Sequence, residues 1–320
     1  MSKKKYLKKY FTYLLERSDL FLFFIITKIV PLKYIYSMAE FIGKVSSILF
    51  PVHRRRVMGN LDLAFGDEKA KKEKIEIYRN FNINFVKNFF EMAASFNRQN
   101  QQPLSNAIRI VGQEHLDASL QKGKGAIAIG GHFGNFTIMG FKMKSAGYRF
   151  HTVVRAFGDP FREKMYEHYR AKQGQLFIPS RPPNEALKRI LQALKKNETV
   201  FLITDENKRH GGVFVDFFHR PASTASGPAV LHLRTGADLL PMFLLRNQDN
   251  THQLIIEPPL NIPDTKDRKA EVEEIMRLIT KKIEEYVRKY PSQWIWTQRR
   301  WRTRPPEEKA KGIEPGYKDY

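Results

Sequence analysis

Short apolar segments alternate with helix-like segments from Ile108 onward, and no other feature of the sequence narrows the possible folds as much. We expect strands at residues 126–129, 150–154, 199–204, 213–218, 239–245 and 253–257. We expect helices at residues 136–145, 184–196, 227–235 and about 266–289. The alternation predicts an α/β sandwich around a mostly parallel sheet, in which ligands gather at the C-terminal ends of the strands.

Upstream of these elements, residues 57–97 have the spacing of a long helix. Apolar side chains recur every three or four residues, at Ile75, Tyr78, Phe81, Phe85, Phe89 and Met92. Such a stripe indicates a helix face that packs against a core. The polar segment 97–103 that follows predicts a loop.

The composition excludes several classes of protein. The chain has 320 residues, of which 42% are hydrophobic and 12% aromatic, so it can bury a substantial core. It contains no cysteine, which excludes disulfides and cysteine metal sites. Lys and Arg number 55 against 33 Asp and Glu, a net charge of +22. This balance favours a polyanionic partner: nucleic acid, an anionic membrane or a phosphorylated substrate.

The N-terminal segment 1–56 combines basic and apolar residues. It has twelve Lys and Arg residues against three acids, with apolar runs at residues 20–26 and 42–52. Continued to Leu32, the first run is interrupted by Thr27, Lys28 and Pro31, so it falls short of the roughly 20 apolar residues that cross a bilayer. Lysines, and no small-residue cleavage site, follow it, which argues against a signal peptide.

We therefore expect residues 1–56 to form a helical segment anchored in an anionic membrane, embedded or tilted rather than a clean crossing. A buried helical hairpin in a soluble domain is the alternative, because short apolar runs are ambiguous. The remaining chain divides into a main domain at residues 57–306 and a tail at residues 307–320 that we expect to be mobile.

A histidine flanked by glycines follows the strand at residues 126–129. The sequence from Gly130 is GGHFGN, with the histidine at position 132. Glycines allow close approach of a substrate, and a neutral imidazole with a pKa near 6.5 suits a general base that deprotonates a hydroxyl. We expect His132 to be catalytic, with backbone amides around Gly134 and Asn135 stabilising an oxyanion at the start of the next helix. The alternative is a loop histidine with a structural role.

A second group of polar and aromatic residues follows the strand at residues 199–204. Asp205 and Glu206 lie at its end, where a carboxylate could orient an imidazole or a substrate hydroxyl; a surface turn is the alternative. Phe214, Phe217 and Phe218 in the next strand cannot all face one side. At least one could line an apolar groove for an acyl chain, or simply pack beneath a helix.

Several segments, taken in order, resemble the bacterial lipid A biosynthesis (Kdo2-lipid A late) acyltransferase family. They are NLDLAF, GGHFGNF, VVRAFGDP, DENKRHGGVFVDFFHRPASTASGPAVLHLRTGADLLPMFLLR and YPSQWIWTQRRWRTRPP. The resemblance covers residues 19–306 and implies a glycerolipid-acyltransferase-like fold. It also implies an enzyme of the bacterial inner membrane, with its catalytic domain on the cytoplasmic face. Such an enzyme moves a fatty acyl group from acyl carrier protein or coenzyme A to a hydroxyl of a phosphorylated lipid A precursor.

One position departs from the family pattern. The family has an acid five residues after the histidine, and this chain has Thr137. A threonine hydroxyl can hydrogen-bond to the imidazole, but it brings no charge to balance the imidazolium. Three explanations stay open: Asp205 or Glu206 replaces the acid in space, Thr137 orients the ring, or the chain is a degenerate homologue that only binds membranes.

The same resemblance suggests roles for other residues. Arg155 aligns with a family arginine and is expected to bind phosphate or thioester oxygens, and Glu206, Phe217 and Arg220 are expected at the substrate site. Near the C-terminus, tryptophans and arginines alternate, a mixture that suits a membrane interface with lipid phosphates. This set comprises Trp294, Trp296, Trp301, Arg299, Arg300, Arg302 and Arg304.

The expected reaction is direct acyl transfer within a ternary complex. The sequence has neither cysteine nor a Gly-x-Ser-x-Gly motif, so the usual nucleophiles of covalent catalysis are missing. We expect no metal and no cofactor. We also expect no nucleic-acid partner, because no basic-region helix, zinc signature or RNA-binding motif occurs. The motifs do not separate lipid A from another envelope lipid as acceptor.

Overall fold

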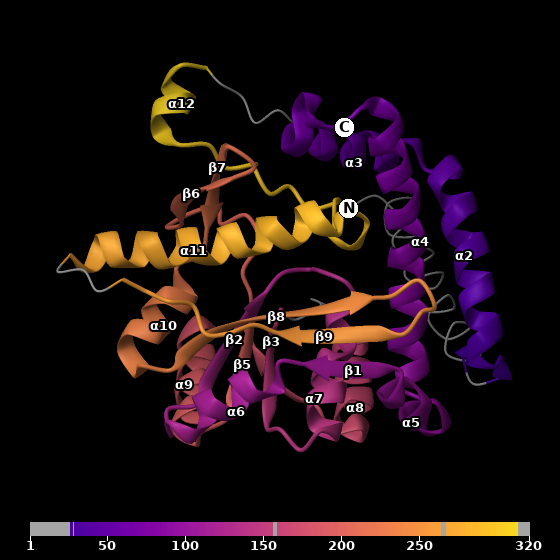
Figure 1. Cartoon of the computed structure of the whole chain (residues 1–320), viewed down its shortest axis with the longest axis horizontal. Coiled ribbons are helices and arrows are strands. Elements are labelled where there is room, and N and C mark those ends of the chain that lie inside the picture. Colours follow the sequence, from indigo (N-terminus) through magenta and orange to yellow (C-terminus); the bar gives the residue numbers. More distant parts are fainter. Residues whose placement is uncertain (1–25, 28, 156–158, 264–266, 313–320) are drawn as a thin grey trace, which may run out of the picture.

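The computed structural model describes residues 26–27, 29–155, 159–263 and 267–312, and its centre is a seven-stranded sheet (Figure 1). The strand order is β1-β9-β8-β2-β5-β3-β4. Only β8 and β9 pair antiparallel, so the predicted mostly parallel sheet is confirmed. The strands are β1 (Ile108–Val111), β2 (Ala126–Gly130), β3 (Phe150–Val154), β4 (Leu176–Pro179), β5 (Thr199–Ile203), β8 (Asp238–Arg246) and β9 (His252–Ile256).

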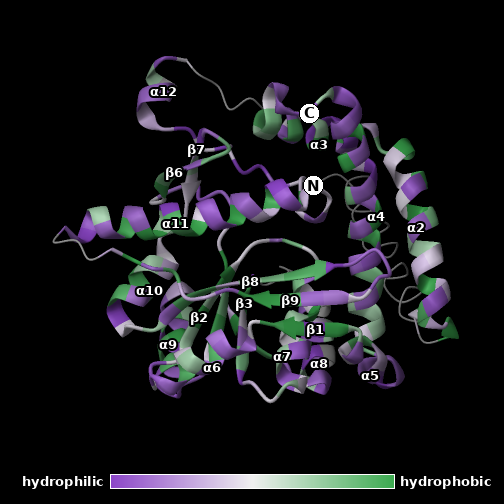
Figure 2. Ribbon diagram, in the orientation of Figure 1, coloured by the Kyte–Doolittle hydropathy of each residue, from purple (hydrophilic) through white to green (hydrophobic). Residues whose placement is uncertain are grey.

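Helices cover the two faces of this sheet. They are α6 (Gln113–Gln121), α7 (Met139–Ser145), α8 (Pro160–Gln173), α9 (Pro183–Lys195), α10 (Gly227–Thr235) and α11 (Arg268–Lys289). Side chains of β2 alternate between the faces, as the period of a strand requires. Ile127 and Ile129 enter the core shared with α9, α10 and α11, whereas Ala126 and Ala128 enter the core shared with α6 and α7. The helices are amphipathic, and hydrophilic and hydrophobic residues alternate along α11 (Figure 2).

The aromatic strand β6 (Val213–Phe217) lies outside the main sheet. It pairs antiparallel with β7 (Arg220–Thr224) in a separate two-stranded sheet that packs on α11. The sequence predicts β6 but not β7, because the segment RPAST begins with Arg-Pro and has no alternating apolar pattern. The turn between the strands places Phe218 and His219 at positive φ.

The long helix expected at residues 57–97 is instead two helices. Helix α3 (Pro51–Phe65) ends at Gly66, which has a φ of 44°, and the short η1 (Gly66–Glu68) leads to α4 (Lys71–Ser95). The predicted core stripe is only partly correct. Tyr78 and Phe81 are buried, but Phe85 and Phe89 are exposed, because the buried face of α4 continues through Phe90 instead.

The loop expected at residues 97–103 is also wrong. These residues begin helix α5 (Arg98–Asn106), and the Asn97 side chain caps its N-terminus by accepting a hydrogen bond from the Gln99 amide. Asparagine is a strong N-cap residue, so a polar segment that looks like a loop can start a helix.

The N-terminal region packs on α4. Helix α2 (Leu32–Leu49) lies along α4 and turns by 89° into the segment that contains α3 (Figure 1). Within the described residues, no single helix is long and apolar enough to cross a membrane, although α2 and α3 pass that test together as a bent pair. Residues 20–25 of the first predicted apolar run lie outside the described residues.

The predicted tail begins with a short helix, α12 (Pro306–Ala310). Arg304 forms an ion pair with Glu308 of this helix. Residues 313–320 of the expected mobile tail lie outside the described residues.

Candidate active site

Two parallel strands place the candidate catalytic residues side by side. Strands β2 and β5 are neighbours in the sheet, with Gly130 in register with Ile203. The segments that follow both strands therefore leave the sheet at the same edge, and the Thr204 amide donates a hydrogen bond to the Gly130 carbonyl at 2.9 Å. This arrangement brings His132 and Asp205 together although 73 residues separate them in the sequence.

The His132 ring is anchored to the Asp205 carboxylate. Nδ1 of the ring lies 2.8 Å from Oδ1 of Asp205, and the His132 amide donates to Oδ2 at 2.8 Å. Oδ2 also accepts hydrogen bonds from Trp294 Nε1 at 2.8 Å and Gln298 Nε2 at 3.1 Å. Asp205 is therefore fixed by neutral donors and has an exposed fraction of 1%.

A glycine makes this close approach possible. A Cβ atom added at Gly131 would lie 2.7 Å from Oδ2 of Asp205, inside the contact distance of real side chains. The residue between the strand end and the histidine must therefore be glycine if the carboxylate is to reach the His132 backbone amide.

The two groups hold each other in the charged form. Burial raises the pKa of Asp205, but attraction to His132 and hydrogen bonds from His132 and Trp294 outweigh it and lower the pKa to about 2. Burial lowers the pKa of the His132 ring, but the Asp205 charge and hydrogen bond, with Glu206, outweigh it and raise the pKa above its ordinary value. The imidazolium that forms when the ring takes up a proton is thus stabilised.

The second ring nitrogen faces a more open environment. Nε2 of His132 lies 3.7 Å from Oε1 of Glu206, whose side chain is 65% exposed. The His132 side chain itself is 20% exposed. Phe136 packs edge-on against the ring, with the ring centroids 5.1 Å apart. Nε2 is therefore the nitrogen of this ring that a substrate hydroxyl can reach.

Thr137 does not orient the histidine. Its hydroxyl donates to Oδ1 of Asn135 at 2.5 Å, and no hydrogen bond joins it to His132 in the part of the chain that the structure describes. Of the explanations for the threonine, the geometry matches the first, in which Asp205 takes the place of the family's acid beside the ring.

The groups expected to form an oxyanion hole have other partners. The Gly134 amide donates to the Gln293 carbonyl at 2.8 Å, and the buried Asn135 side chain donates to Oε2 of Glu91 at 2.6 Å. Gly134 has a φ of 53°, and an added Cβ would lie 1.7 Å from the Leu244 carbonyl oxygen. These contacts fix the loop after His132. The Gly134 amide is occupied, so its predicted oxyanion role is corrected to a structural one, whereas the role of the Asn135 backbone amide stays a prediction.

The C-terminal tryptophans and two arginines are buried, contrary to the prediction of a membrane interface. Trp294, Trp296 and Trp301 have exposed fractions of 0%, 0% and 1%. Arg300 is 1% exposed and donates to the carbonyls of Glu206 and Ser223, and Arg304 is 7% exposed. These buried residues hold the polypeptide around the site in place.

Phe217 is also in the core. It is 1% exposed and packs between Trp294 and Trp301, with ring centroids 5.6 Å away in each case. The structure therefore places Phe217 beneath the site and not on an acyl groove. The Phe214 side chain of the same strand is exposed.

The resemblance motif NLDLAF supports the site from below. Asn60, its first residue, is fully buried and donates to the carbonyl of Trp296 and, at 3.0 Å, to the carbonyl of Gln298. Both acceptors lie in the segment that supplies donors to Asp205. Sequence reasoning identified the motif but could not identify its partner, 236 residues away.

Four predicted binding residues line one open pocket beside the histidine. Its volume is about 220 Å³, and Arg155, Glu206, Arg299 and Arg302 lie in its wall. Asn207, Arg209 and Gln298 complete the lining. The pocket is strongly basic and shares Glu206 with the His132 site. Arg220 is not part of it: this side chain donates to the Leu63 carbonyl at 3.0 Å and lines a separate cavity with Phe65 and Phe218.

Sequence reasoning missed a buried ion pair that contacts the loop after His132 through Asn135. Glu91 of α4 forms two hydrogen bonds with Arg246 of β8, at 2.5 and 2.7 Å. The same carboxylate accepts from Tyr36 of α2 at 2.7 Å and lies 3.4 Å from His252. Glu91 sits within the apolar-looking pattern of α4, and no local signal indicates its partners. Among the described residues, no group of three or more His, Cys, Asp or Glu could hold a metal ion.

The fold and the site together define an α/β domain with a histidine–carboxylate pair where two parallel strands end. A sequence model of the bacterial lipid A biosynthesis acyltransferase family matches residues 3–303, so this chain belongs to that family. The family resemblance drawn from the motifs is therefore confirmed.

Individual relatives are distant. The chain is 35% identical to a phosphatidylinositol mannoside acyltransferase of Mycobacterium tuberculosis over 41% of this chain and 42% of that protein. It is 25% identical to the lipid A biosynthesis lauroyltransferase of Escherichia coli over 86% of this chain and 87% of that protein. It is 24% identical to the palmitoleoyltransferase of the same organism over 86% and 88%. The match to the mycobacterial protein thus spans less than half of its length.

Proposed function

We propose that this protein transfers a fatty acyl group from a thioester donor to a hydroxyl of a phosphorylated glycolipid, such as a lipid A precursor. His132 is the general base. The observation that carries the proposal is the geometry of its ring: Nδ1 is bonded to the buried Asp205, and Nε2 lies 3.7 Å from Glu206, which lines the basic pocket. Acyl carrier protein and coenzyme A are the two candidate donors.

The reaction follows from these positions. Nε2 of His132 takes the proton from the acceptor hydroxyl, and the oxygen attacks the thioester carbonyl. The carbon–sulfur bond then breaks, and the thiolate leaves with the proton that His132 returns. Asp205 stabilises the imidazolium between these steps. The products are an ester and a free thiol, and no covalent acyl-enzyme forms.

The basic pocket supplies phosphate recognition. Arg155, Arg299 and Arg302 line it, and arginine pairs with phosphate oxygens in a bidentate geometry. Because Glu206 belongs both to this pocket and to the surroundings of Nε2, a phosphate held in the pocket places a neighbouring sugar hydroxyl near the ring. Glu206 then accepts a hydrogen bond from the acceptor.

Membrane attachment is part of the proposal. Helices α2 and α3 expose apolar side chains that include Phe41, Ile48 and Phe50, next to the basic run at residues 54–56. Such a surface suits the interface of an anionic bilayer. We place the protein at the cytoplasmic face of the bacterial inner membrane, where a membrane-bound acceptor meets soluble thioester donors.

The test is an acyl-transfer assay with the full chain. Purified protein is mixed with acyl carrier protein or coenzyme A thioesters and with phosphorylated glycolipid in mixed micelles, and mass spectrometry detects the added acyl group. We expect transfer by the wild type and by His115→Ala, a matched variant on α6, and none above background by His132→Ala. Wild-type protein that is inert with every donor supports the degenerate homologue instead.

A second acceptor deserves the same assay. The relative with the highest identity among those described above is named a phosphatidylinositol mannoside acyltransferase. Its acceptor is also a phosphate-bearing glycolipid, which the basic pocket suits equally well. Parallel assays with a lipid A precursor and a phosphatidylinositol mannoside decide between them by the ratio of kcat/KM.

A further inference from the structure

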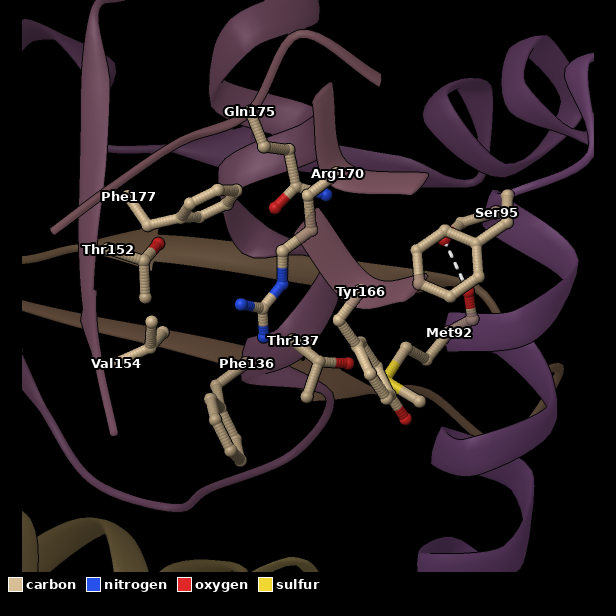
Figure 3. A pocket seen from close by; sticks show the side chains of 11 residues that line it. Met92, Ser95, Phe136, Thr137, Thr152, Val154, Tyr166, Arg170, Gln175 and Phe177 are labelled. Atoms are coloured by element: carbon tan, nitrogen blue, oxygen red, sulfur yellow. Dashed lines mark hydrogen bonds between the residues drawn. The ribbon is translucent and has the colours of Figure 1, made fainter. Parts of the chain in front are cut away.

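A narrow slot begins at the catalytic loop and runs between α4, α8 and the edge of the sheet (Figure 3). Phe136, whose ring packs against His132, forms one side of its mouth, and Thr137 lies beside it. Met92, Val154 and Phe177 contribute apolar surface further along. The slot has a volume of about 50 Å³, so it suits only the first carbons of the donor's hydrocarbon chain, next to the base for acyl transfer.

One charged side chain in the slot does not suit a plain hydrocarbon. Arg170 of α8 reaches toward Thr137, with Phe177 on one side and Tyr166 on the other (Figure 3). Its guanidinium carbon lies 4.8 Å from the centroid of the Phe177 ring and 5.4 Å from that of Tyr166. These cation–π contacts offset part of the cost of burying the charge.

The N–H groups of Arg170 form no hydrogen bonds with the described residues of the protein. Within the described ranges, no carboxylate forms an ion pair with the guanidinium, and none of its N–H groups donates a hydrogen bond to a described residue. Burial lowers the pKa of Arg170, although nearby Tyr166 and Glu163 oppose the shift, so the charge sits in a poorly solvated place. Unpaired N–H donors in a poorly solvated place destabilise the protein unless a ligand oxygen accepts their hydrogen bonds.

Acceptor groups lie on the same wall. Thr152 of β3 and Gln175, which precedes β4, both line the slot. A Cβ added at Gly140 would lie 3.1 Å from Oε1 of Gln175 and 3.4 Å from Oγ1 of Thr152, so the two oxygens are close to one point. In the part of the chain that the structure describes, neither oxygen has a hydrogen-bond partner. Donors and acceptors that converge in this way match a hydroxyl, which both donates and accepts.

We propose that this slot binds the carbonyl end of the donor's acyl chain and selects chains that carry a hydroxyl near that end over unsubstituted chains. Arg170 donates to the hydroxyl oxygen, and Thr152 or Gln175 accepts its proton. A site built for a hydroxyl discriminates against a chain without one, because its own polar groups are then left unpaired. This inference rests on the proposed acyl transfer for its catalytic consequence, but not for binding itself.

The test compares two ligands that differ by one oxygen. Wild-type full chain is assayed with dodecanoyl and 3-hydroxydodecanoyl thioesters, and binding of the two free fatty acids is measured by calorimetry. We expect the wild type to favour the hydroxylated form by about tenfold or more in both kcat/KM and affinity, the size expected for a hydrogen bond to a charged donor. Arg170→Leu abolishes this preference, and Arg170→Lys keeps part of it.

Two further variants guard against misfolding. Thr152→Val removes one hydroxyl without changing the shape of the side chain, and we expect a several-fold smaller preference. Arg189→Leu removes an exposed arginine of α9 and leaves the preference unchanged. A wild type that binds both fatty acids equally, or an Arg170→Leu protein with an unaltered ratio, overturns the inference. Absence of transfer together with an Arg170-dependent binding preference contradicts the proposed function and leaves the slot assignment standing.

Discussion

Two carboxylates among the described residues, Glu91 and Asp205, are almost completely buried and contact a histidine, and they differ in what balances their charge. Glu91 and Asp205 are both 1% exposed. Glu91 is paired with Arg246, a cation at every pH of interest, and the adjacent His252 is 1% exposed. Besides His132, the donors to Asp205 in the described ranges are the neutral side chains of Trp294 and Gln298. Among the described residues bonded to Asp205, only the His132 ring can therefore carry a positive charge, and it does so only when protonated.

This difference separates a structural ion pair from the pair that we propose to be catalytic. Burial raises the pKa of Glu91, but Arg246 and His252 outweigh it and hold this pKa well below its usual range. The His252 ring is buried away from solvent. The His132 ring keeps Nε2 open toward Glu206 and the basic pocket. A buried carboxylate next to a histidine thus marks a reactive pair only where the ring can also reach a substrate.

The largest expected effect is on the reactive pair. Replacing His132 by Ala removes the base, and we expect the rate of acyl transfer to fall by about 10³-fold or more. His252→Ala is the matched change in the structural pair. We expect the folded protein of this variant to transfer acyl groups at a rate within a few fold of the wild type. Rates are normalised to folded protein by circular dichroism. Equal losses in the two variants contradict the distinction drawn between the pairs.

The structural pair is expected to dominate stability. Glu91→Ala leaves Arg246 buried without its counter-charge, so the free energy of unfolding falls by about 3–5 kcal/mol. Asp205→Asn keeps the size of the side chain and leaves no permanent cation unpaired, so it costs less. Urea unfolding of both variants, followed by tryptophan fluorescence, gives the two values. A Glu91 variant as stable as the wild type shows that the ion pair does not hold the loop.

The third effect is the contribution of the Asp205 carboxylate to the rate of acyl transfer. At a pH where the ring is neutral in both proteins, we expect Asp205→Asn to reduce kcat by about 10²-fold, because an amide does not balance the imidazolium. Thr137→Val, which changes a residue that does not contact the ring, reduces kcat by no more than a few fold. Single-turnover rates with a saturating acceptor measure both. A larger loss in the threonine variant assigns the orienting role to Thr137.

The smallest effect separates binding from chemistry. Replacing Arg155 and Arg302 by Gln weakens the phosphate pocket, and we expect KM for a phosphorylated acceptor to rise about tenfold with little change in kcat. The same variant shows no increase in KM for the dephosphorylated acceptor. Wild-type activity also falls as salt is added, since exposed arginines are screened. A KM that depends neither on salt nor on the phosphate of the acceptor contradicts a role of the pocket in phosphate binding.

The sequence predicts the central sheet well for a physical reason. Strands such as β2 and β5 are buried on both faces, so each appears as an uninterrupted apolar run. Its alternation with helices then fixes the parallel arrangement, and this places Asp205 beside His132. For these two buried strands the structure confirms the local pattern.

The errors arise where long-range partners decide. A mixture of arginine and tryptophan has the same composition at a membrane interface and in a core, and only the acceptors of Arg300, 77 and 94 residues away, distinguish the two. The Gly134 amide looks free in the sequence but donates to Gln293. Such partners lie on other elements, and no spacing or propensity within the segment indicates them.

The pH dependence of kcat/KM, measured in wild type and in Asp205→Asn, tests the central claim most directly. The base acts when unprotonated, and Asp205 raises the pKa of the His132 ring, so the acidic limb of the wild-type profile lies above the ordinary histidine value of about 6.5. Without the carboxylate the ring loses its proton more readily, and the limb moves to lower pH. Identical limbs in the two proteins contradict the assignment of His132 and Asp205 as the catalytic pair.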